Sequence, residues 1–135
     1  MDKKEYIEFL KEIKSEYENE KDEIGLKIKQ NSKESSKYTK CNIILLTLML
    51  FENFISSIEQ ENISIKYLWD IIILQELIFV IINISKHEKL FSNTDILEEK
   101  LVNYEKQINT MENVLEFFNT TDENEIKKFL KYKIN

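Results

Sequence analysis

The sequence lacks proline, arginine and alanine, and it contains one glycine, Gly25. Tight β-hairpin turns usually require glycine or asparagine, and glycine-rich phosphate-binding loops require several glycines at fixed spacing. A P-loop and a dinucleotide-binding fingerprint are therefore excluded, and an all-β fold is disfavoured. Isoleucine (21), glutamate (20), lysine (19) and asparagine (13) dominate instead. All but glutamate have A/T-rich codons.

Cysteine and histidine are nearly absent as well. The single cysteine, Cys41, excludes an internal disulfide and a multi-cysteine zinc site. The single histidine, His87, excludes motifs built on paired histidines. Cys41 lies on an apolar stripe, where we expect a small core residue rather than a nucleophile. We predict no catalytic residue, no metal ligand and no cofactor, and therefore a protein that is not an enzyme.

Apolar residues recur at helical spacing along most of the 135 residues, and the length fits a single domain. The sequence predicts an all-α antiparallel bundle of four long helices plus a short C-terminal helix. In this prediction a long N-terminal helix (2–29) is followed by a polar linker, Gln30–Lys37, and a helical core (38–135). Further connections are expected at Glu61–Ser64 and Ser92–Thr94.

The fourth predicted helix has the most regular pattern. Its apolar residues are spaced alternately by four and three positions, which is a heptad seam: Leu97, Leu101, Tyr104, Ile108, Met111, Leu115 and Phe118. Asp95 with Glu98 is expected to cap its start, and Thr120 with Glu123 to cap the short terminal helix. The expected core includes Leu45, Leu48, Trp69, Ile72, Leu101, Ile108, Met111 and Leu115.

The third predicted helix is the most apolar, and it carries one narrow polar stripe. Glu76, Asn83 and His87 fall within about 20° of one direction at 100° per residue, with Val80 among them. Such a stripe either faces solvent, forms a buried hydrogen-bonded network that fixes helix register, or belongs to a partner-binding groove.

The charge is unevenly distributed. The net charge is −6, and residues 91–125 are strongly acidic. We predict that an acidic helix face binds a protein partner with a basic surface; its residues are Glu98, Glu99, Glu105, Glu112 and Glu116. Direct nucleic-acid binding is disfavoured, because arginine is absent and only two lysine patches, Lys27–Lys40 and Lys127–Lys133, support it.

These features favour a small, acidic, cytoplasmic protein that binds a partner protein. In size and helical pattern the chain resembles immunity proteins, antitoxins, phage-encoded inhibitors and small CRISPR subunits, which implies a prokaryotic or phage origin, but no residue is carried over from them. One alternative is a self-associating or complex-subunit module, such as a homodimer that pairs through the seam. Another is a membrane-associated hairpin of Ile43–Ile58 and Tyr67–Ile84, against which the acidic residues Glu52, Asp70 and Glu76 count.

Overall fold

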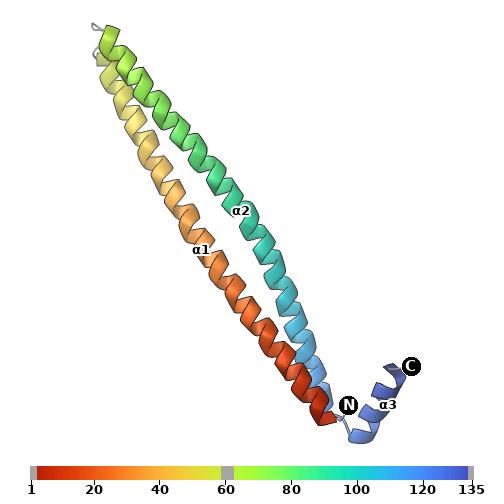
Figure 1. Cartoon of the computed structure of the whole chain (residues 1–135). Coiled ribbons are helices and arrows are strands. Elements are labelled where there is room, and N and C mark those ends of the chain that lie inside the picture. Colours follow the sequence, from red (N-terminus) through yellow and green to blue (C-terminus); the bar gives the residue numbers. More distant parts are fainter. Residues whose placement is uncertain (1–2, 59–62, 134–135) are drawn as a thin grey trace. The chain divides into compact units, whose positions relative to one another are not determined.

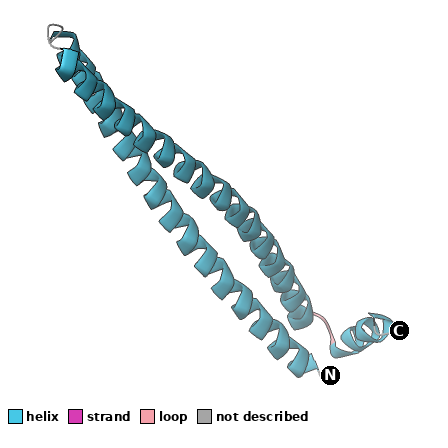
Figure 2. Cartoon of the chain, turned by 45° about the horizontal axis from the view of Figure 1, so that its top comes forward, coloured by secondary structure: helices cyan, strands magenta, loops and turns pink. Residues whose placement is uncertain are grey.

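The computed structural model describes residues 3–58 and 63–133, and this part of the chain contains three helices and no strand (Figures 1 and 2). Helix α1 spans Lys3–Ile58, α2 spans Ile63–Thr120 and α3 spans Glu123–Lys133. The all-α prediction is confirmed. The prediction of four long helices is wrong, because the described chain forms two long helices and one short helix.

Two of the predicted connections are helical. Gln30–Lys37 lies inside α1 and Ser92–Thr94 lies inside α2. Neither segment contains glycine or proline, so the backbone has no strong reason to break there. Half-buried positions also continue through both segments at spacings of three and four, at 28, 31, 35 and 38 in α1 and at 83, 87, 90 and 94 in α2. The helical spacing of half-buried residues therefore continues through both predicted connections.

The helix ends differ in detail from the predicted caps. Asp95 and Glu98 lie within α2, so the predicted capping pair there is wrong. The Thr120 hydroxyl donates to the Glu116 carbonyl inside α2. The first turn of α3 instead closes on Asp122, whose carbonyl accepts hydrogen bonds from the backbone nitrogens of Glu125 and Ile126 at 3.1 Å. The expected connection Glu61–Ser64 lies partly outside the described residues, and its last two residues belong to α2.

The chain divides into two compact units. The terminal unit consists of residues 1–27 and 97–135, and the central unit consists of residues 28–96. In the terminal unit Phe118 of α2 and Ile126 of α3 are each 1% exposed. The Tyr6 ring lies 4.9 Å from the Phe118 ring, centroid to centroid, and the Lys3 ammonium donates to the Thr121 carbonyl at 3.5 Å. These contacts join α1, α2 and α3 within this unit.

In the central unit, α1 and α2 run antiparallel to each other (Figure 1). Val80 is the only buried apolar residue among the described residues of this unit. Two predicted core residues, Leu48 and Ile72, are exposed, so that part of the prediction is wrong. Ile108, by contrast, is buried in the terminal unit as predicted.

Candidate functional site

The two helices of the central unit meet along a seam that is rich in polar residues. Its half-buried or buried positions recur every three or four residues, as in an antiparallel coiled coil. On α1 they include Asn31, Ser35, Tyr38, Asn42, Leu45, Met49, Glu52 and Ser56; on α2 they are Trp69, Ile73, Glu76, Val80, Asn83, His87, Leu90 and Thr94. Sequence reasoning expected Leu45 in the core but missed the polar α1 residues of this seam, because on this segment it followed the apolar residues.

Hydrogen bonds between side chains connect the helices across this seam. The Asn83 amide donates to the Asn42 amide oxygen at 3.0 Å, and the Asn31 amide donates to the Thr94 hydroxyl at 3.3 Å. The Thr94 hydroxyl in turn donates to the Leu90 carbonyl at 2.8 Å. Asn83 of the predicted stripe therefore faces α1 rather than solvent. Glu76 and His87 of the same stripe are half-buried.

Glu52 and Glu76 bring two carboxyl groups together inside the seam. Each side chain is partly buried, and the two groups interact with each other. One oxygen of each, Oε2, is buried and has no hydrogen-bond partner. Two charged carboxylates that face each other between helices destabilise the pair of helices, unless the two groups share a proton or a polar neighbour bonds to them.

Within the central unit, residues 43–58 of α1 and 63–84 of α2 have a mostly apolar outward surface. Large apolar residues are exposed at most of the outward helical positions of these two segments. On α1 they are Ile43, Ile44, Leu46, Leu48, Leu50, Phe51, Phe54 and Ile58; on α2 they are Ile63, Ile65, Tyr67, Leu68, Ile71, Ile72, Leu74, Leu77, Ile78, Phe79, Ile81, Ile82 and Ile84. Phe91 and Ile96 are exposed farther along α2, after Lys89. Each long helix contains an 18-residue window that is apolar enough to cross a membrane. The buried share of this window is 0% in α1 and 6% in α2.

Several polar side chains on this outward surface bond to their own helix. Thr47 donates to the Ile43 carbonyl at 2.8 Å, Asn53 to the Met49 carbonyl at 2.9 Å, and Ser57 to the Phe54 carbonyl at 2.7 Å. Such bonds reduce the need for water around an apolar helix. Lys66, Asp70 and Gln75 are exposed, and no hydrogen bond or ion pair is seen for them in the described chain.

Lysines gather where the apolar surface ends. Lys33, Lys37 and Lys40 of α1 and Lys86 and Lys89 of α2 are all exposed. The Lys86 ammonium lies 5.9 Å from the centroid of the Tyr38 ring. We call these five residues the lysine collar.

The predicted acidic face lies in the terminal unit, and two of its residues are engaged there. The Lys14 ammonium lies 2.8 Å from a Glu112 carboxylate oxygen, and the Lys21 ammonium 3.2 Å from one of Glu105. The hydrogen bond to Glu112 raises the pKa of Lys14. Glu98, Glu99 and Glu116 are exposed and take part in no ion pair among the described residues. Two glutamates of the predicted acidic face are therefore held in ion pairs with α1, and the other three remain exposed.

A tyrosine contact lies beside these ion pairs. The Tyr104 hydroxyl donates a hydrogen bond to the Glu20 carboxylate, and its ring packs edge-on against Tyr17 with centroids 5.4 Å apart. The hydrogen bond to Glu20, followed by burial, raises the pKa of Tyr104. The heptad seam predicted from Leu97 to Phe118 therefore packs against α1 of the same chain.

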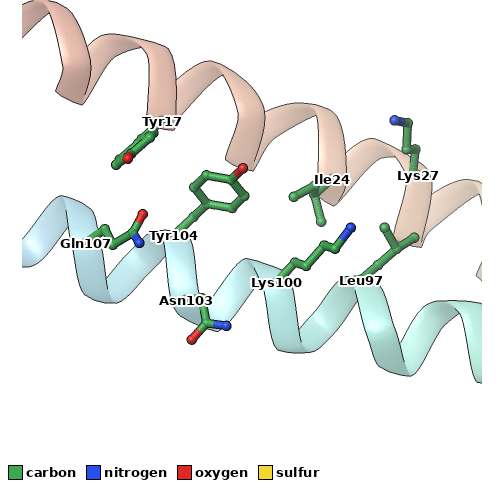
Figure 3. A pocket seen from close by; sticks show the side chains of 8 residues that line it. All are labelled: Tyr17, Ile24, Lys27, Leu97, Lys100, Asn103, Tyr104 and Gln107. Atoms are coloured by element: carbon green, nitrogen blue, oxygen red, sulfur yellow. The ribbon is translucent and has the colours of Figure 1, made fainter.

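A groove of about 460 Å³ runs along this part of the terminal unit. Its lining residues are Tyr17, Ile24, Lys27, Leu97, Lys100, Asn103, Tyr104 and Gln107 (Figure 3). The lining polar groups do not converge on one point, since the Lys27 ammonium is directed away from α2 (Figure 3). Within the described chain no group of three or more histidine, cysteine, aspartate or glutamate side chains could hold a metal ion.

Cys41, which was expected in the core, is exposed at the edge of the apolar surface, so that prediction is wrong. Comparison with family models, curated proteins and solved structures found no match to this chain. The arrangement of the central unit, with its polar seam, apolar exterior and lysine collar, is therefore the basis for a functional proposal.

Proposed function

We propose that the central unit inserts into a lipid bilayer as a helical hairpin and anchors the terminal unit at the membrane. The observation that supports this is the reversed placement of polar and apolar residues. Asn42, Asn83, Glu52 and Glu76 face the helix seam, whereas most of the large apolar residues are exposed. A hairpin in water would favour the opposite placement, because burial of apolar surface drives folding there.

The dimensions of the apolar segment fit a bilayer. At 1.5 Å per residue, α2 advances roughly 29 Å from Tyr67 to Lys86, and α1 advances roughly 27 Å from Lys40 to Ile58. The hydrocarbon core of a bilayer is about 30 Å thick. Tyr67 and Trp69 then lie near one interface and Tyr38 near the other, where aromatic residues with a polar group are enriched.

The acidic residues Glu52, Asp70 and Glu76 oppose membrane insertion, and their positions reduce the free-energy cost of insertion. An acidic residue at the centre of a membrane helix costs about 2.5–3.5 kcal/mol. Glu52 and Glu76 face the seam and each other rather than lipid, as ionisable residues within membranes generally do. Asp70 is exposed, but it directly follows Trp69 and so lies near the interface in this proposal.

The lysines indicate the orientation. The collar holds five lysines, whereas Lys66 is the only lysine between Lys40 and Lys86 in the sequence. Because lysine-rich flanks remain in the cytoplasm, both flanks of the hairpin are proposed to be cytoplasmic. The expected cytoplasmic location is thereby retained as a proposal for the terminal unit.

A second copy of the chain is the competing occupant of the apolar surface. One additional hairpin covers one side of this surface, whereas large apolar residues are exposed along both helices. Complete coverage in water would therefore need several copies. Flotation with vesicles separates membrane insertion from self-association. A soluble oligomer is monodisperse without detergent and does not float with vesicles.

The decisive measurement uses Trp69, the only tryptophan. Full-length protein diluted from detergent into phosphatidylcholine vesicles should float with them, and its tryptophan emission should shift to shorter wavelength. Ile78→Lys places a charge in the middle of the apolar surface and should reduce flotation roughly a hundredfold, since lysine costs about 3 kcal/mol there. Val102→Lys, at an exposed apolar site of the terminal unit, is the matched control. Equal flotation of both variants would contradict the proposal.

A second candidate function is binding of a basic protein partner through the acidic residues of the terminal unit. Glu98, Glu99 and Glu116 support it, because they are exposed and take part in no ion pair in the described chain. Immobilised wild-type protein should capture a basic protein from a cell lysate in low salt. High salt should release that protein, because salt screens attraction between exposed charges. Replacing these three glutamates by glutamine should abolish that capture, whereas Glu105→Gln with Glu112→Gln should have less effect.

A further inference from the structure

The lysine collar occupies a single level of the central unit. Two hydrogen bonds across the seam fix the register there: Asn31 pairs with Thr94, and Asn42 pairs with Asn83. All five collar lysines lie between these two bonds in sequence. Because the helices are antiparallel, residues 33–40 of α1 are opposite residues 85–92 of α2. The lysines of both helices therefore form one band.

This band carries a net positive charge that faces outward. Only Glu34 and Glu88 oppose the five lysines between these bonds, which leaves a charge of +3 with His87 neutral. At 100° per residue, Lys33, Lys37 and Lys40 share the face of α1 opposite the seam. No ion pair neutralises a collar lysine in the described part of the chain.

The band also borders directly on the apolar surface. The nearest residues of that surface are Ile43, three residues after Lys40, and Ile84, two residues before Lys86. One exposed apolar residue, Phe91, lies within the band itself. If the apolar surface lies in hydrocarbon, the collar lies at the depth of the lipid headgroups. The long lysine side chains can place their aliphatic portions along the helix while the ammonium groups reach the phosphates.

We propose that the lysine collar binds the phosphates of anionic phospholipid headgroups, and this inference rests on the proposed insertion of the hairpin. Lysine suits this role because its ammonium is a mobile point charge that donates to phosphate oxygens. Each basic residue near an anionic surface contributes about 1 kcal/mol, or roughly fivefold in affinity. A preference for anionic membranes should therefore depend on the collar and not on lysines elsewhere.

The test compares vesicles of phosphatidylcholine with vesicles that also contain 30% phosphatidylglycerol. In low salt the full-length wild-type protein should bind the anionic vesicles at least about tenfold more tightly. The triple variant Lys33→Gln, Lys37→Gln and Lys40→Gln should lose most of this preference while still inserting. The matched triple variant Lys11→Gln, Lys100→Gln and Lys106→Gln, at exposed sites of the terminal unit, should keep it.

The outcomes distinguish the two proposals. If Trp69 emission shifts equally with both vesicle types and the two triple variants behave alike, the hairpin inserts but the collar proposal is overturned. If Trp69 emission responds to neither vesicle type, insertion itself is overturned. If inorganic phosphate at constant ionic strength weakens the preference, it competes with the headgroup phosphates for the same ammonium groups, which supports the headgroup proposal. If the wild-type protein binds both vesicle types equally tightly, the headgroup proposal is overturned.

Discussion

Asn83 donates a hydrogen bond to Asn42 at 3.0 Å, and this bond joins α2 to α1 where the apolar surface of the central unit ends. An amide pair at a seam position favours one register, because any shift leaves both amides unpaired. Such bonds contribute about 0.6 kcal/mol on average within membranes, with a maximum near 1.7 kcal/mol. The pair therefore acts more on register than on total stability.

We expect Asn83→Leu to broaden the separation of the two helices near this bond. Spin labels at Cys41 and at Ser85→Cys, both exposed, would report that separation. The wild-type pair should give one narrow distance distribution, and Asn83→Leu a broader one. Ile82→Leu, a neighbouring exposed change, serves as the control. An unchanged distribution in Asn83→Leu would show that the amide pair does not set the register.

Removing the charges of Glu52 and Glu76 should favour the membrane-inserted state. The double variant Glu52→Gln and Glu76→Gln replaces two acidic groups that face each other with neutral amides that can bond to each other. We expect vesicle partitioning to increase roughly tenfold or more, given a cost near 3 kcal/mol for a charged acid in a membrane helix. Glu99→Gln with Glu116→Gln should leave partitioning unchanged. Weaker partitioning of the first variant would indicate that the carboxyl pair stabilises the hairpin.

The packing of α3 should depend on Phe118 and much less on its neighbour Phe117. Phe118 is 1% exposed, whereas Phe117 is 42% exposed. Replacing a buried phenylalanine by alanine costs about 3–5 kcal/mol, so Phe118→Ala should expose α3 to proteolysis and to rapid amide exchange. Phe117→Ala provides the matched control with a smaller effect. Equal proteolysis of both variants would argue against a core at Phe118.

The terminal unit should lose stability in alkali. The folded-state pKa of Lys14 is raised above its ordinary value of 10.5 and that of Tyr104 above 10.0. A raised pKa means that the stabilisation is complete below the unfolded-state value and disappears as the pH rises through the folded-state value. Melting temperatures followed by circular dichroism should therefore fall above about pH 10. Tyr104→Phe combined with Lys14→Met should flatten this fall, and Tyr38→Phe should not.

The orientation of the hairpin can be tested with cysteine labelling. Cys41 borders the collar and is the only cysteine. In a bacterial inner membrane, a membrane-impermeant maleimide added to intact spheroplasts should label a Cys41→Ser, Ser57→Cys variant and leave the wild type unlabelled until lysis. The reverse pattern would show that the collar faces outward, against the distribution of lysines.

The sequence alone was sufficient for the helical class and for one long seam. The heptad spacing from Leu97 to Phe118 predicts a packed stripe, and the structure places all seven residues at buried or half-buried positions. The number of helices was not predictable in the same way. Serine and asparagine at Gln30–Lys37 are compatible with a loop or with a helix, and only the partner helix decides between them.

The polar seam of the central unit illustrates what only the tertiary structure decided. Helical spacing aligned Glu76, Asn83 and His87 on one face, but it did not reveal whether that face meets water or another helix. Asn42 and Glu52 answer the question from a distant part of the chain. Local spacing determines which residues share a face, whereas the direction of that face depends on contacts between segments far apart in sequence.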